Sequence, residues 1–304
     1  MKLLITGDIH LTNRRPRNRV DDYKQTCLTK LKFILNKAEH MKVDFVLMPG
    51  DLWDSPDPSY DFFTETLTTI KKHHFVRIIT IAGQHDLLHR RFQNTAMRAL
   101  ISSVENIIYL SSSGDYSSEY HHGKFVFQGS GFGEEIPPIK EECFNILLTH
   151  RMIIMSKLWE DQTDYEYASA VIRRHKYNLI VSGDNHKSFV YKSGKRILVN
   201  CGAMMRSHID QTDHLPQVVY IDTNDMEPQP IFIPIIPAKE VFNMEKVIHE
   251  KAVNEKISAF VNGLSTYKAT ELSFTDNLNS FIQKEKLDPV IVDIIKECMY
   301  EENN

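Results

Sequence analysis

Five segments of this 304-residue chain share one feature: a short, apolar, strand-like run ends, and ionisable or amide side chains follow within a few residues. These five ends are Gly7-Asp8-Ile9-His10, Gly50-Asp51-Leu52-Trp53-Asp54, Gly83-Gln84-His85-Asp86, Thr149-His150 and Gly183-Asp184-Asn185-His186. In open α/β sheets, ligands gather beyond the carboxyl ends of the strands. We therefore expect the polar side chains of all five segments to meet in one cleft.

Each segment alone has an ordinary structural explanation. Asp8 and His10 could form a turn, Asp51 could cap the helix that follows, and His150 could be a hydrogen-bonded structural histidine. Coincidence is a poor explanation for all five together, because each one follows a β-like run. The combined pattern favours a single shared site.

The chemistry of that site follows from its donor types. Carboxylates, imidazoles and an amide, with no thiolate among them, suit divalent ions such as Mn, Fe or Zn. The donors suffice for two ions that share one carboxylate, and paired ions roughly 3.5–4 Å apart clamp a phosphoryl group and generate hydroxide at neutral pH. The pattern therefore indicates a phosphoesterase.

The order of the expected elements predicts a layered α/β fold. Nine strand-like runs are present, near residues 3–6, 45–48, 76–81, 107–110, 125–128, 146–149, 179–182, 197–200 and 218–221. Helical periodicity at 23–41 and 60–74 separates the early runs, and this alternation is typical of an α/β sandwich. Three prolines within 229–238 indicate a linker or a final edge strand.

The series of motifs resembles that of the calcineurin-like metallophosphoesterases, which carry Asp-x-His, Gly-Asp-x-x-Asp, Gly-Asn-His-Asp, a lone His and Gly-His-x-His. Within that family the chain most resembles the SbcD-type nuclease subunit of DNA double-strand-break repair complexes. The narrower likeness rests on Gly50–Ser59 and on Asn200–Arg206. The resemblance covers roughly residues 1–225 and implies a four-layer α/β/β/α sandwich with a C-terminal helical extension.

The resemblance also implies roles for individual residues. The first metal ion would be held by Asp8, His10, Asp51 and His186. The second would be held by Asp51, Gln84, His150 and Asp184, with Asp51 bridging the two ions. His85 would donate a proton or hydrogen bond toward the scissile phosphate, and Asp86 could orient the His85 ring. The expected cofactors are two divalent ions, Mn²⁺ first, with Mg²⁺, Fe or Zn as alternatives.

Two residues depart from the family pattern, and both belong to the second ion's set. Gln84 stands in place of the family's asparagine, and Asp184 stands in place of its histidine. Because an acid replaces a neutral imidazole, we expect this half of the site to prefer harder ions such as Mn²⁺ or Mg²⁺. The rival expectation is a weakly occupied second position with low activity.

The net charge of −4 is unlike that of a globally basic nucleic-acid binder, so any DNA contact should be local. The arginines expected to contact a DNA backbone are Arg14, Arg15, Arg17, Arg19, Arg90 and Arg206. A solvated loop is the alternative for the first four, and core packing is the alternative to substrate contact for Trp53. Activity on nucleotides or small phosphodiesters, or a binding or scaffold role, remains the alternative to a DNA nuclease.

The resemblance further implies three regions and two partners. Residues 1–228 would form the nuclease domain, 229–270 a linker with a reduced cap, and 271–304 a helical pair. That pair would bind an SbcC-type coiled-coil ATPase, or else pack onto its own body, and the chain would form a homodimer. Scattered cysteines and the lack of a long apolar run favour a cytoplasmic protein without a membrane partner, in the host cytoplasm if the protein is viral.

Overall fold

The computed structural model describes residues 1–120, 123–159, 162–248, 252–253, 257, 274–285, 289 and 292. The chain divides into two compact units, Met1–Pro237 and Ala238–Asn304. The first unit contains both large sheets and every segment that carries a predicted site residue.

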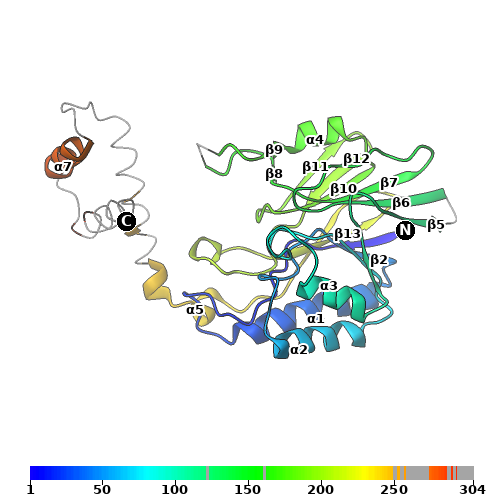
Figure 1. The fold of residues 1–304 in the computed structure, drawn as a ribbon, viewed down its shortest axis with the longest axis horizontal. Coiled ribbons are helices and arrows are strands. Elements are labelled where there is room, and N and C mark those ends of the chain that lie inside the picture. The colour runs from blue at the N-terminus through cyan, green and yellow to red at the C-terminus, as the bar shows by residue number, and fades with distance from the viewer. Residues whose placement is uncertain are drawn as a thin grey trace. The chain divides into compact units, whose positions relative to one another are not determined.

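Two six-stranded sheets form the centre of the first unit (Figure 1). The first sheet has the order β14 (Gln229–Phe232), β13 (Gln217–Asp222), β1 (Lys2–Ile5), β2 (Phe45–Met48), β3 (Ile78–Thr80) and β4 (Ile107–Tyr109). The second has the order β11 (Phe189–Ser193), β12 (Arg196–Asn200), β10 (Leu179–Gly183), β7 (Phe144–His150), β6 (Gly123–Ser130) and β5 (Asp115–Tyr120). Strands β1 to β4 are parallel to one another, and so are β6, β7, β10 and β12.

Helices cover the outer faces of both sheets. Figure 1 shows α1 (Tyr23–Met41), α2 (Tyr60–Lys72) and α3 (Ala96–Ser103) on the first sheet and α4 (Ala168–Arg174) on the second. A short pair, β8 (Ile153–Ile154) and β9 (Glu166–Tyr167), precedes α4, and the 3-10 turn η1 (Ile209–Gln211) follows β12. The predicted four-layer α/β/β/α arrangement is confirmed.

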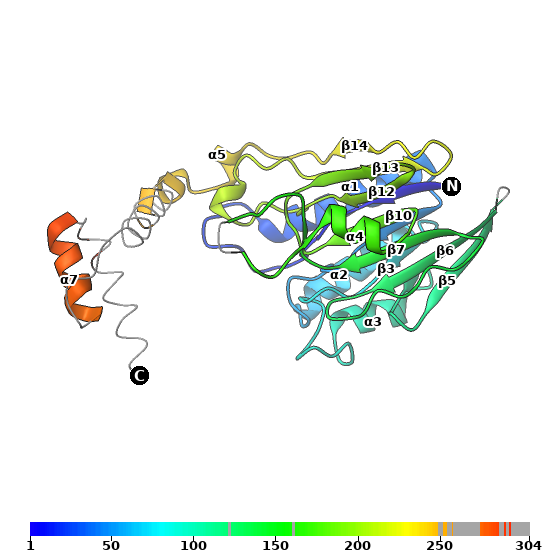
Figure 2. The ribbon, with the colours of Figure 1, turned by 90° about the horizontal axis from the view of Figure 1, so that it is seen from above.

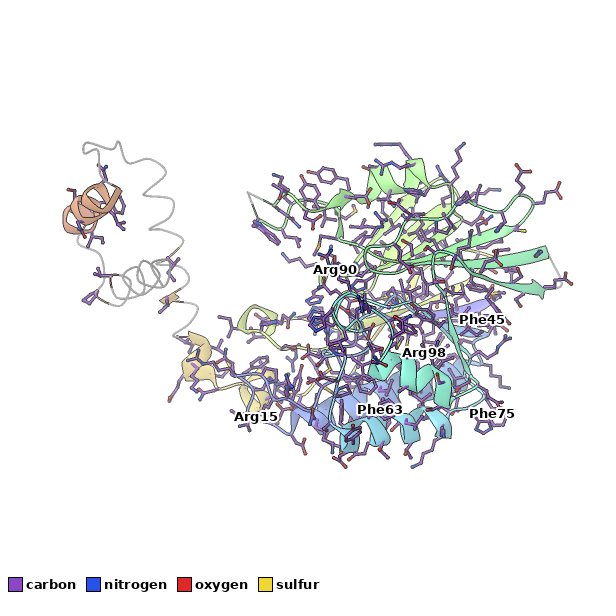
Figure 3. All side chains as sticks on the ribbon, in the orientation of Figure 1. Arg15, Phe45, Phe63, Phe75, Arg90 and Arg98 are labelled. Carbon is purple, nitrogen blue, oxygen red and sulfur yellow. The ribbon has the colours of Figure 1, made fainter. Side chains whose placement is uncertain are left out.

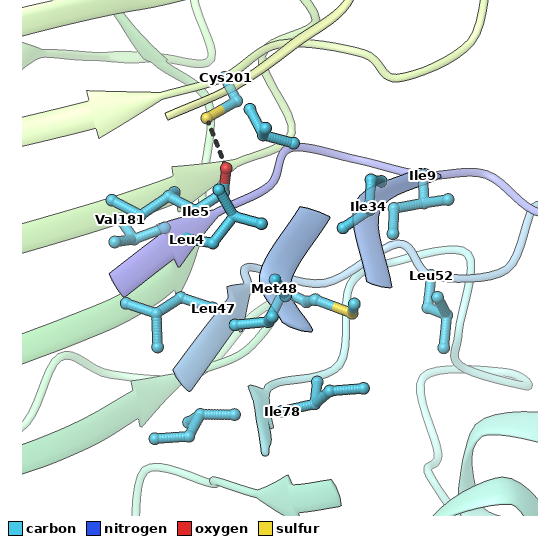
Figure 4. Close-up of a cluster of buried hydrophobic side chains, with 14 of the residues drawn as sticks. Leu4, Ile5, Ile9, Ile34, Leu47, Met48, Leu52, Ile78, Val181 and Cys201 are labelled. Atoms are coloured by element: carbon cyan, nitrogen blue, oxygen red, sulfur yellow. Dashed lines mark hydrogen bonds between the residues drawn. The ribbon is translucent and has the colours of Figure 1, made fainter. Parts of the chain in front are cut away.

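Both faces of the second sheet are packed against other side chains, which explains why its strands are continuous apolar runs in the sequence. Successive side chains of a strand point to opposite faces. Ile146 and Leu148 of β7 pack into the large core between the sheets, whereas Leu147 between them packs on the other face with Val171 and Ile172 of α4. Both faces of this sheet are therefore buried, as expected for a parallel sheet that is covered on both sides. Figure 4 shows part of the large core, where the Cys201 thiol donates to the Ile5 carbonyl.

The sequence around 23–41 explains both where α1 begins and ends and which of its faces is buried. The Asp22 side chain accepts from the Gln25 amide at the N-terminus, and Lys42 takes the left-handed conformation that ends the helix. The spacing of Leu28, Leu31, Ile34 and Ala38 places them on one face of the helix, and all four are buried, as the periodicity predicts.

Residues 229–232 form the edge strand β14, which pairs antiparallel with β13 (Figure 2). Of the two alternatives for this proline-containing segment, the edge strand is the one observed, and Pro230 at an edge leaves no inner ladder bond unmade. The first unit therefore includes β14 and runs on to Pro237.

The second unit is described in part. It contains α5 (Ala238–Val241) and α7 (Phe274–Glu285), and α7 buries Leu278 and Phe281 as its predicted periodicity requires. The sequence also predicts an amphipathic helix over 239–262 and another that begins at Asp288-Pro289, and much of the first and most of the second lie outside the described residues. In the parts of the chain that are described, no helix combines the length and apolar character needed to cross a bilayer.

Candidate active site

The carboxyl ends of parallel strands from both sheets meet at one place. Asp8, Asp51 and His85 follow β1, β2 and β3 of the first sheet, and His150 and Asp184 stand at the ends of β7 and β10 of the second. A direct bond joins the sheets here, because the Asp184 amide donates to Asp8 Oδ2 at 2.9 Å. The predicted convergence of these strand ends is therefore present in the fold.

Backbone amides hold the two central carboxylates. Asp8 and Asp51 are 0% and 1% exposed, and the His85 amide donates to Asp51 Oδ1 at 2.8 Å. The Met204 amide in turn donates to the Asp8 carbonyl at 2.8 Å, and the Met204 carbonyl accepts from Lys30 Nζ at 2.6 Å. These contacts fix both carboxylates on rigid backbone before any ligand arrives.

Three histidine rings surround the carboxylates. His10 Nε2 lies 3.1 Å from His186 Nε2 and 3.7 Å from Asp51 Oδ2, and His186 Nε2 lies 3.7 Å from Asp8 Oδ2. His150 Nε2 lies 3.3 Å from Asp51 Oδ2, and its Nδ1 donates to the Pro49 carbonyl at 2.8 Å. Nδ1 must carry a proton to make this bond. In a neutral His150 ring, Nε2 is therefore the nitrogen with the free lone pair, and it faces Asp51.

The backbone is bent sharply at three of the predicted ligands. His10, Asp51 and Asp184 have φ values of 49°, 46° and 78°. Such left-handed residues without glycine cost about 1–3 kcal/mol each and cluster at functional sites. All three residues lie within five positions of the end of the preceding strand.

Two sets of donor atoms lie close enough to share an ion. In each set the ligand atoms lie within 4.8 Å of one another, and the sets are Asp8, His10 and His186, and His10, Asp51 and His85. The first set matches three of the four residues predicted for the first ion. The second set includes His85, which the resemblance places outside the ligands.

The residues predicted for the second ion are less tightly assembled. His150 contacts Asp51, but Gln84 is exposed, and Asp184 contributes its backbone amide to Asp8. The Asp184 carboxyl is half-buried, and burial raises its pKa while the nearby His150 opposes that rise. The ligand roles of Gln84 and Asp184 stay predictions.

Asp86 does not orient His85 in this structure. Its buried carboxylate accepts from the Trp53 amide at 3.0 Å and from the Gly83 amide at 2.9 Å. It therefore connects the loop after β2 with the loop after β3. His85 Nδ1 instead lies 3.2 Å from the carbonyl oxygen of Asp54. The Asp54 carboxylate also lies near the His10 ring, with Oδ1 at an ion-pair distance of 3.4 Å from His10 Nδ1.

The structure divides the six predicted DNA-binding arginines into two groups. Arg14, Arg15, Arg17 and Arg90 are exposed, and Figure 3 labels Arg15 and Arg90 on loops before α1 and after β3. Arg19 and Arg206 are each 3% exposed, and both donate to internal acceptors. Because both guanidinium groups are almost fully buried, the structure offers neither of them to a DNA backbone at the surface, unlike the four exposed arginines.

Trp53 is also internal. It is fully buried and packs against Phe62 and Phe63, so core packing is the alternative that holds.

The buried donors fit a bound cation. Among the described residues, Asp8 Oδ1, Asp51 Oδ2 and His150 Nε2 are buried and make no hydrogen bond. The last two atoms lie 3.3 Å apart without hydrogen-bond geometry, so both are available to the same ligand. Leaving such atoms unpaired costs about 1–3 kcal/mol or more each, and a divalent ion satisfies all three at once.

Without an ion, protons balance part of the negative charge of the cluster, and a bound cation would replace them, including the proton on His150 Nε2. Burial raises the pKa of Asp8 to about 7, although the neighbouring His150 opposes the rise. Burial alone would lower the pKa of His150, but the adjacent Asp51 carboxylate raises it to about 10. Burial also lowers the pKa of His186 to about 4, so this ring is a neutral lone-pair donor at pH 7.

Two open cavities flank the cluster. One, of about 310 Å³, is lined by His10, His85 and His186 together with Arg14 and Arg15. The other, of about 420 Å³, is lined by His150 and Asp184 together with Arg151, Phe132 and three acids. The first combines the histidines with exposed cations, which suits an anionic substrate.

A family comparison decides the class of site. Residues 1–188 match the calcineurin-like phosphoesterase family. The chain belongs to that family. This phosphoesterase is therefore a metal-dependent phosphoester hydrolase, and its clustered aspartates and histidines are where a divalent metal can bind.

Individual relatives are more distant. The phosphoesterase is 24% identical over 272 residues to the DNA double-strand break repair protein Mre11 of Methanosarcina mazei, covering 86% of this chain and 42% of that one. It thus spans about two fifths of that relative's length. Solved structures similar to it include TT1561 of Thermus thermophilus (12% identity, TM-score 0.49, 77% of this chain and 99% of that one) and an archaeal phosphodiesterase (15%, 0.42, 76% and 99%).

Proposed function

We propose that this phosphoesterase hydrolyses DNA phosphodiester bonds with two divalent ions, Mn²⁺ by preference. The observation that carries the proposal is the set of buried, unbonded ligand atoms Asp8 Oδ1, Asp51 Oδ2 and His150 Nε2 at the meeting point of the sheets. His10 and His186 complete the set on the exposed side. The likeness to Mre11 and the SbcD-type motifs support DNA as the substrate.

The ligand residues and His85 have separate roles in this proposal. Bound divalent ions supply Lewis acidity and a hydroxide nucleophile at neutral pH. Arg14 and Arg15 line the same cavity as His85 and attract the anionic backbone. Because His85 Nδ1 donates to the Asp54 carbonyl, Nε2 is the ring nitrogen left to exchange a proton with the phosphate or the leaving oxygen.

The test is digestion of linear duplex DNA by the full chain with and without Mn²⁺. Wild type should degrade the duplex only with the ion. His85→Ser should lower the rate about 10²–10⁴-fold, the usual contribution of a general acid, while bound metal measured by mass spectrometry stays unchanged. His74→Ser, an exposed histidine beyond the end of α2, is the matched control and should behave as wild type.

Each other outcome has a distinct meaning. Loss of metal from His85→Ser would make His85 a ligand, as its place in the set with His10 and Asp51 allows. Hydrolysis of small chromogenic diesters alone would support the stand-alone phosphodiesterase. Failure of wild type to take up any metal would reject the proposal and favour a binding or scaffold role.

We further propose, from the same resemblance, that the chain acts as the nuclease subunit of an SbcCD-like complex, dimerises, and binds a coiled-coil ATPase through its C-terminal helices. The resemblance alone carries this assignment, because Leu278 and Phe281 of α7 are already buried within the chain. Copurification of a long coiled-coil ATPase with the tagged chain from its native source would test this assignment.

A further inference from the structure

A second group of basic side chains surrounds a cavity that shares no lining residue with the histidine-lined cavity. This cavity has a volume of about 260 Å³. Arg19, Lys30 and Arg206 line it, together with the polar start of α1 and the apolar segment 234–236. All three cations belong to the first unit, and they come from the loop before α1, from α1 itself and from the loop after β12.

The three cations are buried. Arg19, Lys30 and Arg206 are 3%, 5% and 3% exposed. Asp21 is paired with Arg19, since its two carboxylate oxygens each accept from the Arg19 guanidinium at 2.8 Å, and Oδ2 also accepts from the Thr26 hydroxyl. Asp22, the other acid in the wall, is exposed and caps α1.

Lys30 has no such partner. Its ammonium donates to the Met204 carbonyl at 2.6 Å, and among the described residues no carboxylate forms an ion pair with it. Burial, followed by the charges of Arg206 and Arg19, lowers the pKa of Lys30 to about 7. A buried ammonium beside two guanidinium groups is unfavourable unless an anion joins it.

We propose that this cavity binds a phosphate group, either free or carried by a nucleotide. A phosphate carries a charge of about −1.5 to −2 at pH 7 and offers several acceptor oxygens. It can therefore pair with the Lys30 ammonium and balance the Arg206 charge at the same time. Guanidinium groups favour phosphate because their planar donors match its oxygens. The apolar wall at 234–236 leaves room for an organic group attached to the phosphate.

The experiment is calorimetric titration of the full chain, freed of metal with a chelator so that no bound ion holds phosphate in the histidine-lined cavity. Inorganic phosphate should bind with a stoichiometry of one. Lys30→Met should weaken that binding about tenfold or more, the loss expected for one charge-assisted hydrogen bond. Lys32→Met, an exposed lysine on the same helix, should leave it unchanged.

A parallel titration with deoxyadenosine monophosphate identifies the source of the phosphate. Tighter binding than inorganic phosphate supports a nucleotide, and equal or weaker binding supports the free anion. The melting temperature of wild type in phosphate against chloride of equal ionic strength gives a second readout that needs no variant, and Lys30→Gln gives a second substitution. Absence of binding at millimolar phosphate, or equal affinity in Lys30→Met, would overturn the proposal.

Discussion

At the scale of single residues, Asp54 organises the site without belonging to either ligand set. Its carboxylate lies 3.4 Å from His10 Nδ1, and its carbonyl oxygen lies 3.2 Å from His85 Nδ1. One residue therefore contacts two imidazole rings, with a hydrogen bond to the predicted donor His85 and an ion-pair distance to the predicted ligand His10. Carboxylate partners of this kind raise the basicity of a ligating histidine and fix its tautomer.

We expect Asp54→Ala to lower Mn²⁺ affinity about 10–100-fold, the usual effect of removing a histidine's carboxylate partner. The substitution removes the contact to His10 but keeps the backbone carbonyl that holds His85. Titration of Mn²⁺ into the chelator-treated protein would measure the loss. Asp57→Ala, an exposed acid of the same loop, is the control, and unchanged affinity in Asp54→Ala would remove Asp54 from the site.

Asp184 sets a second expectation at this scale. With an acid in place of the family's histidine, the second ion position should favour Mn²⁺ or Mg²⁺, and Asp184→His should shift the preference toward softer ions such as Zn²⁺. Competition between Mn²⁺ and Zn²⁺, followed by metal analysis of both proteins, would show the shift. Two tightly bound ions of unchanged identity in both proteins would contradict it.

At the scale of elements, the site exists because strand ends from two sheets approach without side chains between them. A Cβ on Gly183 would lie 2.5 Å from Asp8 Oδ1 and 2.7 Å from His150 Nδ1. A Cβ on Gly50, which has a φ of 98°, would lie 2.6 Å from the same His150 atom. Glycine at these ends is what allows the carboxylate of one sheet to reach the imidazole of the other.

Gly183→Ala should therefore destabilise the fold by about 1–3 kcal/mol and reduce metal binding together, because the added methyl group displaces Asp8 and His150. Thermal unfolding and Mn²⁺ titration would be measured on the same preparation. Gly114→Ala is the matched control, since its nearest neighbour would be 3.9 Å away. A Gly183→Ala protein with wild-type metal affinity would show that the strand ends can separate without harm to the site.

Periodicity was enough to predict the strands and helices that build the site. All nine strand-like runs are strands, and the predicted helix over 23–41 has the observed bounds of α1. The edge strand β5 (Asp115–Tyr120) is polar throughout and gives no alternation to detect, and α3 and α4 span only 8 and 7 residues. A signal for α3 was present, because Thr95 caps it by accepting from the Arg98 amide.

The order of the motifs predicted which strand ends converge, but the supporting contacts could not be predicted. The Pro49 carbonyl reaches His150 across 101 residues, and Lys30 reaches Met204 across 174. Neither contact has a local sequence signal, since both depend on how the sheets pack. For the same reason the sequence predicts one exposed basic loop after His10. In the structure Arg14 and Arg15 are exposed, whereas Arg19 is buried.

At the scale of the whole molecule, one large core couples the sheets, so global unfolding should report on any buried charge. Lys30 has a folded pKa of about 7 against an ordinary value of 10.5. Arg206 and Arg19 act with burial to lower this pKa, while the smaller effects of Cys27 and Asp21 oppose it. Below the folded pKa both states are protonated, and the folded state bears the full burial penalty.

The free energy of unfolding should therefore rise between pH 7 and about 10.5 as the unfolded state alone stays protonated at this residue, and the penalty disappears above that range. In phosphate-free buffer, Lys30→Met should be more stable than wild type at pH 7 by roughly 3–5 kcal/mol at most. The difference should shrink toward the alkaline end. Chemical denaturation at several pH values would measure it, and a constant difference would contradict the assigned cause.

The backbone of one residue, Met204, links the two sites. The Met204 amide holds the Asp8 backbone, and the Met204 carbonyl receives Lys30. If an anion near Lys30 changes manganese affinity by some factor, manganese must change the anion's affinity by that same factor, because linkage between two equilibria is reciprocal. A diester hydrolase yields products that end in a phosphate monoester, so a group of this kind bound near Lys30 and a metal ion at Asp8 would then affect each other's affinity.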